Sequence, residues 1–421
     1  GLRGDIRQAN SYYDDVHKSF GRFDYVLANP PFNVDDVNLS KVEGDPRFNT
    51  YGVPRNKGDA KKKEQGAATV PNANYLWINL FATSLKPTGR AALVMANSAS
   101  DARHSEADIR KNLIENNLIY GMLTLPSNMF YTVTLPATLW FFDKNKQDDK
   151  ILFIDARNIF TQIDRAHREF SEEQVQNIAI ISRLHRGNRR AFIELVHNYY
   201  ASGFACLNEN RPKLAEVAAK LLEFLKENQV KILPDFASVL KEAEKLSKAH
   251  ADYLKSVDLA DIAGANRAQR KLAETIAPFF ARLHELLKEA DKAVRHLEKE
   301  QSRNKDLKQL KTELEKLHKE AGASEYFFGH IAWLHERFPE AKYEDVTGLC
   351  KLAGPEELKE QEYSLNPGRY VGVVIEEDGK TEEEFIEEML TLNDELEKLN
   401  AEAHALEAVI GKNIRLIAGE E

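Results

Sequence analysis

Cysteine is scarce in this sequence, which contains only Cys206 and Cys350 among its 421 residues. Two distant cysteines exclude a disulfide framework and a cysteine-based metal site, and they suit a reducing cytoplasm. The twelve histidines follow neither the HExxH pattern nor another paired ligand spacing, so no metal is expected. Walker and Gly-x-Ser-x-Gly motifs are absent, which argues against a P-loop nucleotidase and an α/β-hydrolase. No run of eighteen apolar residues occurs, so the sequence predicts no membrane-spanning helix.

The chain also lacks an excess of positive charge. Its 58 lysines and arginines are outnumbered by 67 aspartates and glutamates, which gives a net charge of −9. This balance neither supports nor excludes a nucleic-acid partner, because a local groove can be basic on an acidic protein. The length, with 43% hydrophobic residues, suits two or three globular domains. Residues 1–5 show neither an initiator methionine nor the start of a signal peptide, so we expect a piece of a longer gene product.

Residues 1 to about 157 alternate short apolar runs with helical stretches. Residues 23–28 are β-branched and aromatic, which predicts a buried strand. A helical apolar stripe covers residues 72–86, and Ser105 begins a second expected helix that ends at Asn117. Further strands are expected at 91–96, 118–125, 138–142 and 151–155. This alternation predicts an α/β fold with a largely parallel sheet, in which the closely spaced last strands form an antiparallel edge.

A long stretch without a strong apolar repeat, residues 33–67, separates the first strand from the first helix. It contains four glycines and the basic residues Arg47, Arg55, Lys57, Lys61, Lys62 and Lys63. A loop of this length inside a compact domain is usually functional or disordered. A solvated mobile loop and a DNA-facing loop are both open interpretations.

After residue 170 the pattern becomes helical. Ser171 and Gln174 predict a capping box at the start of this region. Between residues 212 and 320, leucines recur at three- and four-residue steps, so we expect long paired helices with a hairpin near residues 302–304. We accordingly divide the chain into an α/β domain (1–200), a coiled-coil-like helical region (201–330) and a C-terminal assembly region (331–421).

The most regular apolar repeat lies near the C-terminus. Steps of four and three residues alternate through Phe385, Met389, Leu392, Leu396, Leu399, Ala403, Leu406 and Ile410. A helix with one apolar face needs a partner that covers this face. The sequence leaves open whether the partner is another protein or the chain's own helices between residues 212 and 320.

The tetrapeptide Asn29-Pro30-Pro31-Phe32 carries the strongest chemical signal. It follows an expected strand, where open α/β sheets place their ligand-binding loops. Two prolines stiffen the turn, so the Asn29 side-chain oxygen and the Pro30 carbonyl can accept both hydrogens of an exocyclic amine. That grip keeps the nitrogen lone pair available to attack an electrophilic methyl group, while Phe32 offers a face for a flipped base. The structural alternative is a rigid turn at the end of a strand.

This motif and its surroundings resemble the N6-adenine DNA methyltransferases, and more closely the modification subunit of type I restriction–modification systems. The matching segments follow in the same order: DYVLANPPFN, NANYLWINLF, GRAALVMANSASDARHSE, MFYTVTLPATLWFF, ILFIDARNIF and SLNPGRYVG. The resemblance implies a partial Rossmann-like methyltransferase sheet followed by a long-helix C-terminal region. It also implies methyl transfer from S-adenosyl-L-methionine to adenine N6 in double-stranded DNA.

The resemblance assigns roles to individual residues of the tetrapeptide. Asn29 and Pro30 hold the adenine N6, Pro31 shapes the loop, and Phe32 stacks on the base. Implied partners are double-stranded DNA, a specificity subunit, a restriction subunit and a second modification subunit.

Two further residues receive roles from the same resemblance. Phe130 corresponds to a second aromatic residue against the flipped adenine, although a core aromatic explains it equally. Asp5 corresponds to an acidic residue that contacts the cofactor's adenine. The Gly-rich cofactor loop of such enzymes is not found among the residues before Asn29, and neither is their N-terminal helical domain. We therefore expect a truncated form whose isolated chain is inactive.

Two other functions stay open at this point. A non-catalytic remnant would keep the helical region and bind partners or DNA without transferring methyl groups. A methyltransferase acting on a glutamine side chain or on RNA would use the same kind of loop. The long helices and the SLNPGRYVG segment count against this last reading.

Overall fold

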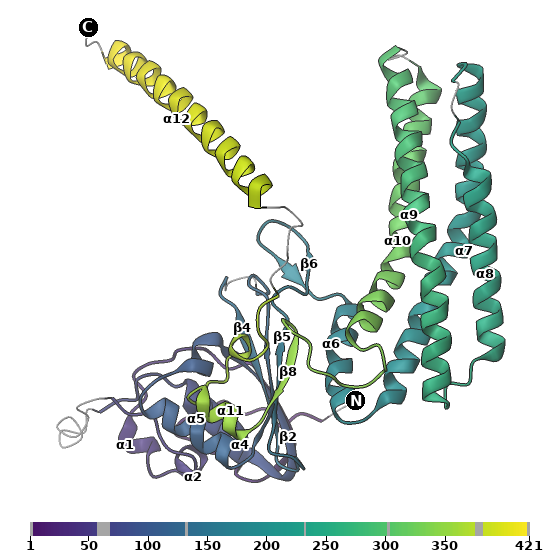
Figure 1. Cartoon of the computed structure of the whole chain (residues 1–421). Coiled ribbons are helices and arrows are strands. Elements are labelled where there is room, and N and C mark those ends of the chain that lie inside the picture. The colour runs from purple at the N-terminus through teal and green to yellow at the C-terminus, as the bar shows by residue number, and fades with distance from the viewer. Residues whose placement is uncertain are drawn as a thin grey trace. The chain divides into compact units, whose positions relative to one another are not determined.

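The fold is described from a computed structural model of the chain (Figure 1). The structure describes residues 3–56, 68–130, 134–230, 233–300, 304–374 and 382–418. Residues 1–372 form one compact unit and residues 373–421 form a second, and each is treated by itself.

A six-stranded sheet organises the first unit, in the spatial order β1-β2-β4-β3-β5-β8. Its strands are β1 (Phe23–Ala28), β2 (Leu85–Ala96), β3 (Ile119–Thr124), β4 (Ala137–Asp143), β5 (Ile151–Asp155) and β8 (Cys350–Ala353). The pairs β1–β2 and β3–β5 are parallel, whereas β4 is antiparallel to both β2 and β3. Strand β8 is antiparallel to β5. Four strands therefore share one direction, and the predicted α/β fold class is confirmed.

The position of the antiparallel strands corrects one expectation. The closely spaced strands β4 and β5 do not form an antiparallel edge, because β4 lies inside the sheet between β2 and β3. The antiparallel edge strand is β8, which lies far along the chain. Nothing in the local pattern of residues 350–353 signals that they pair with residues 151–154.

Three helices cover one face of the sheet: α4 (Asn74–Ser84), α5 (Ser105–Glu115) and α11 (Pro355–Glu360) (Figure 1). Tyr75 of α4 packs with Trp140 of β4, whose ring lies edge-on at 6.1 Å between centroids. The predicted helices are confirmed, and α5 begins at Ser105 as expected. His104 occupies the cap position, and the Ser105 hydroxyl donates to the Arg55 carbonyl at 3.0 Å.

The long segment after β1 is folded in its first half. Helices α1 (Leu39–Val42) and α2 (Pro46–Asn49) bury Leu39, Val42 and Phe48 in a small core of their own. Residues 57–67, with the four lysines noted above, lie outside the described residues.

The helical half of the first unit begins with α6 (Glu172–His185), whose predicted capping box between Ser171 and Gln174 is confirmed. Long helices follow, as expected: α7 (Arg189–Glu227), α8 (Phe236–Ser256), α9 (Ile262–Glu300) and α10 (Lys305–Arg337). Asn304 caps α10, while residues 301–303 of the expected hairpin lie outside the described residues. The proposed domain boundaries remain predictions; residue 200 falls within α7, and β8 returns the chain to the sheet.

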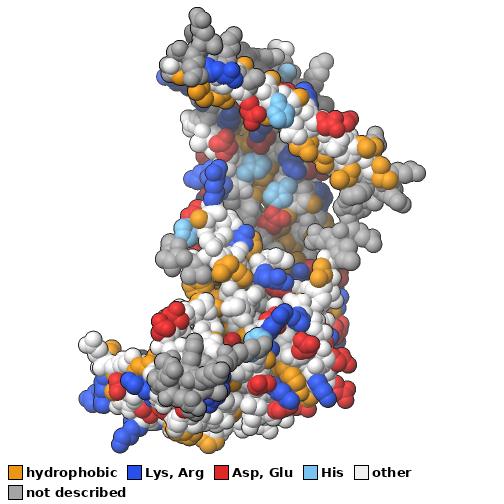
Figure 2. Space-filling view, turned by 90° about the vertical axis from the view of Figure 1, so that its left-hand side faces the viewer, with side chains coloured by type: hydrophobic (Ala, Val, Ile, Leu, Met, Phe, Trp, Pro, Cys, Tyr) orange, Lys and Arg blue, Asp and Glu red, His pale blue; other side chains and the backbone are white. Residues whose placement is uncertain are grey.

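The second unit contains α12 (Glu382–Ala418). Its apolar repeat is exposed, with Leu396 55% and Leu399 56% accessible to solvent. Figure 2 shows these hydrophobic side chains, in orange, along the helix at the top of the view. Among the described residues of this unit, 373–374 and 382–418, no second helix covers the apolar repeat.

His250 in α8 makes the stability of the bundle depend on pH. Its side chain is 8% exposed, and its ring stacks on Phe204 with 4.1 Å between centroids. Burial, followed by the nearby His197, lowers the pKa of His250 to about 4, whereas an unfolded histidine has a pKa of about 6.5. The unfolded chain therefore binds a proton first. Stability is complete above pH 6.5 and falls by roughly 2–3 kcal/mol as the pH drops towards 4.

This dependence is measurable by urea unfolding between pH 7.5 and pH 4. His250→Phe keeps a ring against Phe204 and is expected to reduce the loss of unfolding free energy with falling pH by about 2–3 kcal/mol. The remainder includes His335, whose pKa burial also lowers to about 4. His404→Phe, at an exposed position of α12, serves as the matched control and should leave the wild-type slope unchanged. An unchanged slope in His250→Phe would contradict the assignment.

Candidate active site

The chain turns away from the sheet directly after β1, at the tetrapeptide Asn29–Phe32. Pro30 is buried, Phe32 is half-buried, and Asn29 and Pro31 are exposed. Within the described part of the chain, the Asn29 side chain makes no hydrogen bond. Its amide oxygen is therefore available to a ligand, while the buried Pro30 anchors the turn.

The position of this loop follows from strand direction. Ala28 of β1 pairs in parallel with Leu93 of β2, so the carboxyl ends of both strands lie at the same edge of the sheet. Asn97 begins the short helix η1 (Asn97–Asp101) after β2, and Thr138 donates to its side-chain oxygen at 2.8 Å. Open α/β sheets bind ligands at this edge.

Phe130 lies in the loop after β3, at the same edge of the sheet. It is half-buried and packs against the main hydrophobic core, while residues 131–133 lie outside the described residues. The ends of β1 and β3 are three strand positions apart in the sheet, or about 14 Å at about 4.8 Å per strand. The structure thus places Phe130 and the tetrapeptide on one edge without showing them in contact.

A small hairpin supports the loop that carries Phe130. Its strands are β6 (Thr161–Gln162) and β7 (Arg168–Glu169). The backbone N–H of Arg168 donates to the Asn128 carbonyl at 3.0 Å, and its guanidinium donates to the Ser127 hydroxyl at 3.1 Å. The same guanidinium lies 4.0 Å from the centre of the Phe160 ring. Sequence reasoning missed Arg168, because no local pattern reveals these contacts.

Asp5 is exposed and already paired. The Arg7 guanidinium donates to both carboxylate oxygens, at 2.9 and 3.0 Å. The hydrogen bond from Arg7 lowers the pKa of the Asp5 carboxyl below its usual range. The pairing orients the carboxylate, whose remaining lone pairs face solvent, and it gives no support of its own for a contact with a cofactor's adenine.

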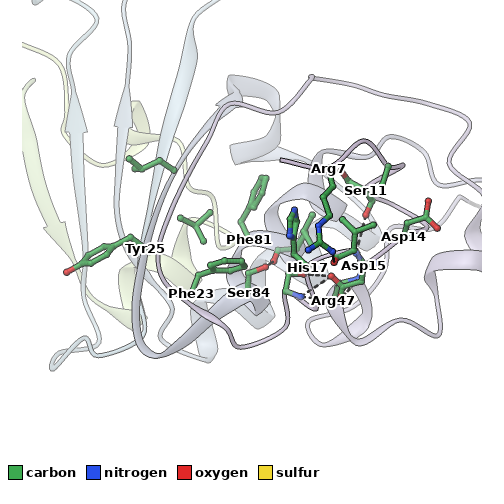
Figure 3. Close-up of a pocket in the computed structure, with 16 residues that line it drawn as sticks. Arg7, Ser11, Asp14, Asp15, His17, Phe23, Tyr25, Arg47, Phe81 and Ser84 are labelled. Atoms are coloured by element: carbon green, nitrogen blue, oxygen red, sulfur yellow. Dashed lines mark hydrogen bonds and ion pairs between the residues drawn. The ribbon is translucent and has the colours of Figure 1, made fainter. Parts of the chain in front are cut away.

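A cavity of about 420 Å³ lies between the N-terminal segment, β1 and α4 (Figure 3). Phe23, Tyr25 and Phe81 form part of its wall, and the charged side chains of Asp15 and Arg47 lie 3.9 Å apart at another side. None of the residues Asn29–Phe32 lines this cavity. We therefore treat it as separate from the candidate site.

The described residues offer no metal site and no membrane span. No group of three or more histidine, cysteine, aspartate or glutamate side chains among them is arranged to hold a metal ion. Likewise, no helix in the ranges that the structure describes is long and apolar enough to cross a membrane.

Comparison with known proteins connects this geometry to a family. Residues 2–197 match the N-6 DNA Methylase family. The MjaIX methylase subunit of a type I restriction enzyme from Methanocaldococcus jannaschii is 41% identical over 184 residues, which cover 42% of this chain and 31% of the relative. The HindI methylase subunit from Haemophilus influenzae is 35% identical over 160 residues, 38% of this chain and 33% of the relative.

A solved structure with the same kind of description also matches. The type I restriction–modification methyltransferase subunit from Streptococcus thermophilus is 25% identical, with a TM-score of 0.36, over 41% of this chain and 34% of that one. The matches span about a third of the length of the curated relatives. Residues 2–197 thus resemble the N-6 DNA Methylase family, and within it the methylase subunits of type I restriction enzymes.

Proposed function

We propose that this chain acts in the transfer of a methyl group to adenine N6 of double-stranded DNA, as part of a type I restriction–modification complex. The observation that carries the proposal is the Asn29–Phe32 loop at the carboxyl edge of the sheet, with an unpaired Asn29 amide. Its partners would be the DNA, a specificity subunit, a restriction subunit and a second methylase subunit.

The chemistry at this loop concerns the substrate amine. The Asn29 side-chain oxygen and the Pro30 carbonyl oxygen accept the two N6 hydrogens, so the nitrogen lone pair is not drawn into the purine ring. A sulfonium donor would supply the methyl group: its carbon–sulfur bond would break as the nitrogen–carbon bond forms, a neutral thioether would leave, and the proton lost from N6 would pass to water. Phe32, half-buried beside these groups, stacks on the extruded base and offsets part of the unstacking cost.

The methyl donor that similarity to this family implies is S-adenosyl-L-methionine. Asp5 is the single residue that resemblance assigns to it, and Arg7 holds both oxygens of that carboxylate. No Gly-rich loop that could cradle the donor stands among residues 3–28, and we assign none of the described residues to it. The chain isolated from its partners is therefore expected to bind S-adenosyl-L-methionine more weakly than about 1 mM. Calorimetric titration checks this, and a micromolar dissociation constant would overturn it.

Complementation in the source organism tests the proposed function. Deletion of the coding sequence should remove N6-methyladenine from one recognition sequence of the genome, as detected by sequencing of native DNA. The wild-type chain should restore the modification, whereas Asn29→Ala should not. Unchanged N6-methyladenine in the deletion strain would reject the proposal.

A second candidate, a non-catalytic assembly module, is favoured by the lack of a Gly-rich donor loop among residues 3–28. If the chain is such a module, both the wild-type chain and Asn29→Ala would restore N6-methyladenine to the deletion strain.

Mass spectrometry of RNA and protein from the same strains tests the remaining alternative, a methyltransferase that acts on RNA or on a glutamine side chain. Loss of a methylated RNA base or a methylated glutamine, with DNA unaffected, would favour that substrate class.

A further inference from the structure

The side chain of Asn74 faces the backbone that immediately follows the tetrapeptide. Asn74 is the first residue of α4 and is 3% exposed. Its side-chain oxygen accepts from the Asn33 backbone N–H at 2.9 Å, and its side-chain nitrogen donates to the Asn33 side-chain oxygen at 2.8 Å. Asn33 has a left-handed backbone, with φ of 53°. The two asparagines therefore form a reciprocal amide pair one residue beyond Phe32.

Further backbone bonds continue this contact along the chain. The Ala73 N–H donates to the Val34 carbonyl at 2.8 Å, and the Val70 N–H donates to the Val37 carbonyl at 3.0 Å. The exit of the loop is thus tied to the segment before α4. Its entrance is tied to the sheet, because Ala28 pairs with Leu93. Residues 29–32 therefore lie between two segments that hydrogen bonds hold in place.

Helix α4 is itself firmly held. The Tyr75 hydroxyl donates to the Ala99 carbonyl at 2.7 Å, which joins the start of the helix to the turn after β2. One turn later, the Asn79 side chain donates to the carbonyls of Phe48 and Gly52, at 2.8 and 2.7 Å. The hydrogen bonds between Asn74 and Asn33 therefore fix the exit of the loop to a firmly held helix.

We propose that Asn74 is a positioning residue for methyl transfer: its amide pair with Asn33 sets the direction of the Asn29 side chain and the plane of Phe32. The proposal rests on the function proposed above. Asn74 touches neither substrate nor reacting atoms, so its effect runs through loop geometry. A displacement of about 1 Å in such a loop lowers the rate of the chemical step about 100-fold.

Substitutions by aspartate test the pair without removing volume. In Asn74→Asp, a carboxylate oxygen still accepts from the Asn33 N–H, and the Asn33 amide can turn over to donate to the other oxygen. In Asn33→Asp, the Asn74 amide nitrogen still has an acceptor. The double variant Asn33→Asp with Asn74→Asp sets two carboxylates face to face, which breaks the pair by repulsion.

The expected result is strongly non-additive. Each single aspartate variant should methylate within about fivefold of wild type, whereas the double variant and Asn74→Leu should lose about 100-fold in kcat, with KM for DNA changed by less than threefold. The assay uses the complex purified from the source organism through a tag on this chain. Asn72→Ala is the matched control: it removes the bond from the Asn74 N–H to the Asn72 side chain, 3.0 Å long, and keeps the amide pair.

Hydrogen–deuterium exchange of the chain supplies a readout that needs no activity. The double variant should speed exchange of the amides in residues 29–36, while those of α4 keep their protection. Unchanged exchange in residues 29–36, or a double variant with wild-type kcat, overturns the positioning role. If the wild-type complex transfers no methyl group, the proposed function is rejected instead. The exchange measurement then decides by itself whether the amide pair fixes the loop.

Discussion

Asn29→Ala is expected to lower the single-turnover rate of methyl transfer by about 100-fold or more in the complex purified through a tag on this chain, because it removes an acceptor that acts on the reacting amine. The Asn29 side chain makes no hydrogen bond among the described residues. Its removal should therefore leave the melting temperature and the affinity for duplex DNA close to wild type. Rapid quenching with a labelled methyl donor measures the rate, and fluorescence anisotropy measures the affinity.

Asn29→Asp is the informative comparison for this prediction. It keeps an acceptor oxygen of the same shape and adds a charge, so its loss of rate should be smaller than that of the alanine variant. A near-normal single-turnover rate in Asn29→Ala would remove the catalytic interpretation and leave the tetrapeptide as a rigid turn. A fall in melting temperature of several degrees would instead point to a structural role.

Glutamate at both Leu396 and Leu399 is expected to weaken assembly with partner subunits by about 1,000-fold. Both leucines are more than half exposed in α12, and burying each one contributes about 2 kcal/mol to a complex. The melting temperature of the first unit should not change if the apolar repeat contacts a partner. Analytical ultracentrifugation with the partner subunits and calorimetry of the isolated chain measure the two effects.

Two changes on the outer side of the same helix control for added charge. Ala401→Glu and Ala405→Glu bring the same charge to exposed positions outside the apolar repeat, and they should leave assembly intact. If the double variant Leu396→Glu with Leu399→Glu no longer unfolds cooperatively, this result would favour packing of the apolar repeat against the chain's own helices. Equal loss of assembly in both double variants would mean that charge, and not the apolar repeat, governs the contact.

The parts of the fold that sequence predicted are those with a local cause. The apolar and aromatic run of residues 23–28, the apolar stripe of α4 and the capping box at Ser171 each contain their signal within a few residues. The prediction that the first of these strands is buried was wrong, because β1 lies at an edge of the sheet with Tyr25 75% and Leu27 85% exposed. The tetrapeptide was found in the same way, because its chemistry and its place after a strand are both local. The confirmed elements include β1, whose carboxyl end carries the candidate site. The roles of the site residues themselves stay predictions.

The parts that sequence missed depend on partners far along the chain. Strand β4 was expected near an edge and lies inside the sheet, since its register is chosen by β2 and β3 together. Arg168 and Asn74 support the two loops of the candidate site through residues 41 positions distant, and neither has a distinctive neighbourhood in sequence.

The late position of β8 has a consequence for synthesis of the protein. Strand β5 finds its outer neighbour only when residues 350–353 have been made, after all the helices from α6 to α10. Roughly 200 residues separate the two strands, which takes about 10–40 s at ordinary ribosomal rates. During that interval the outer edge of β5 presents unpaired backbone groups to other nascent chains. The ribosome-bound chain should therefore need a chaperone most while the bundle is being translated.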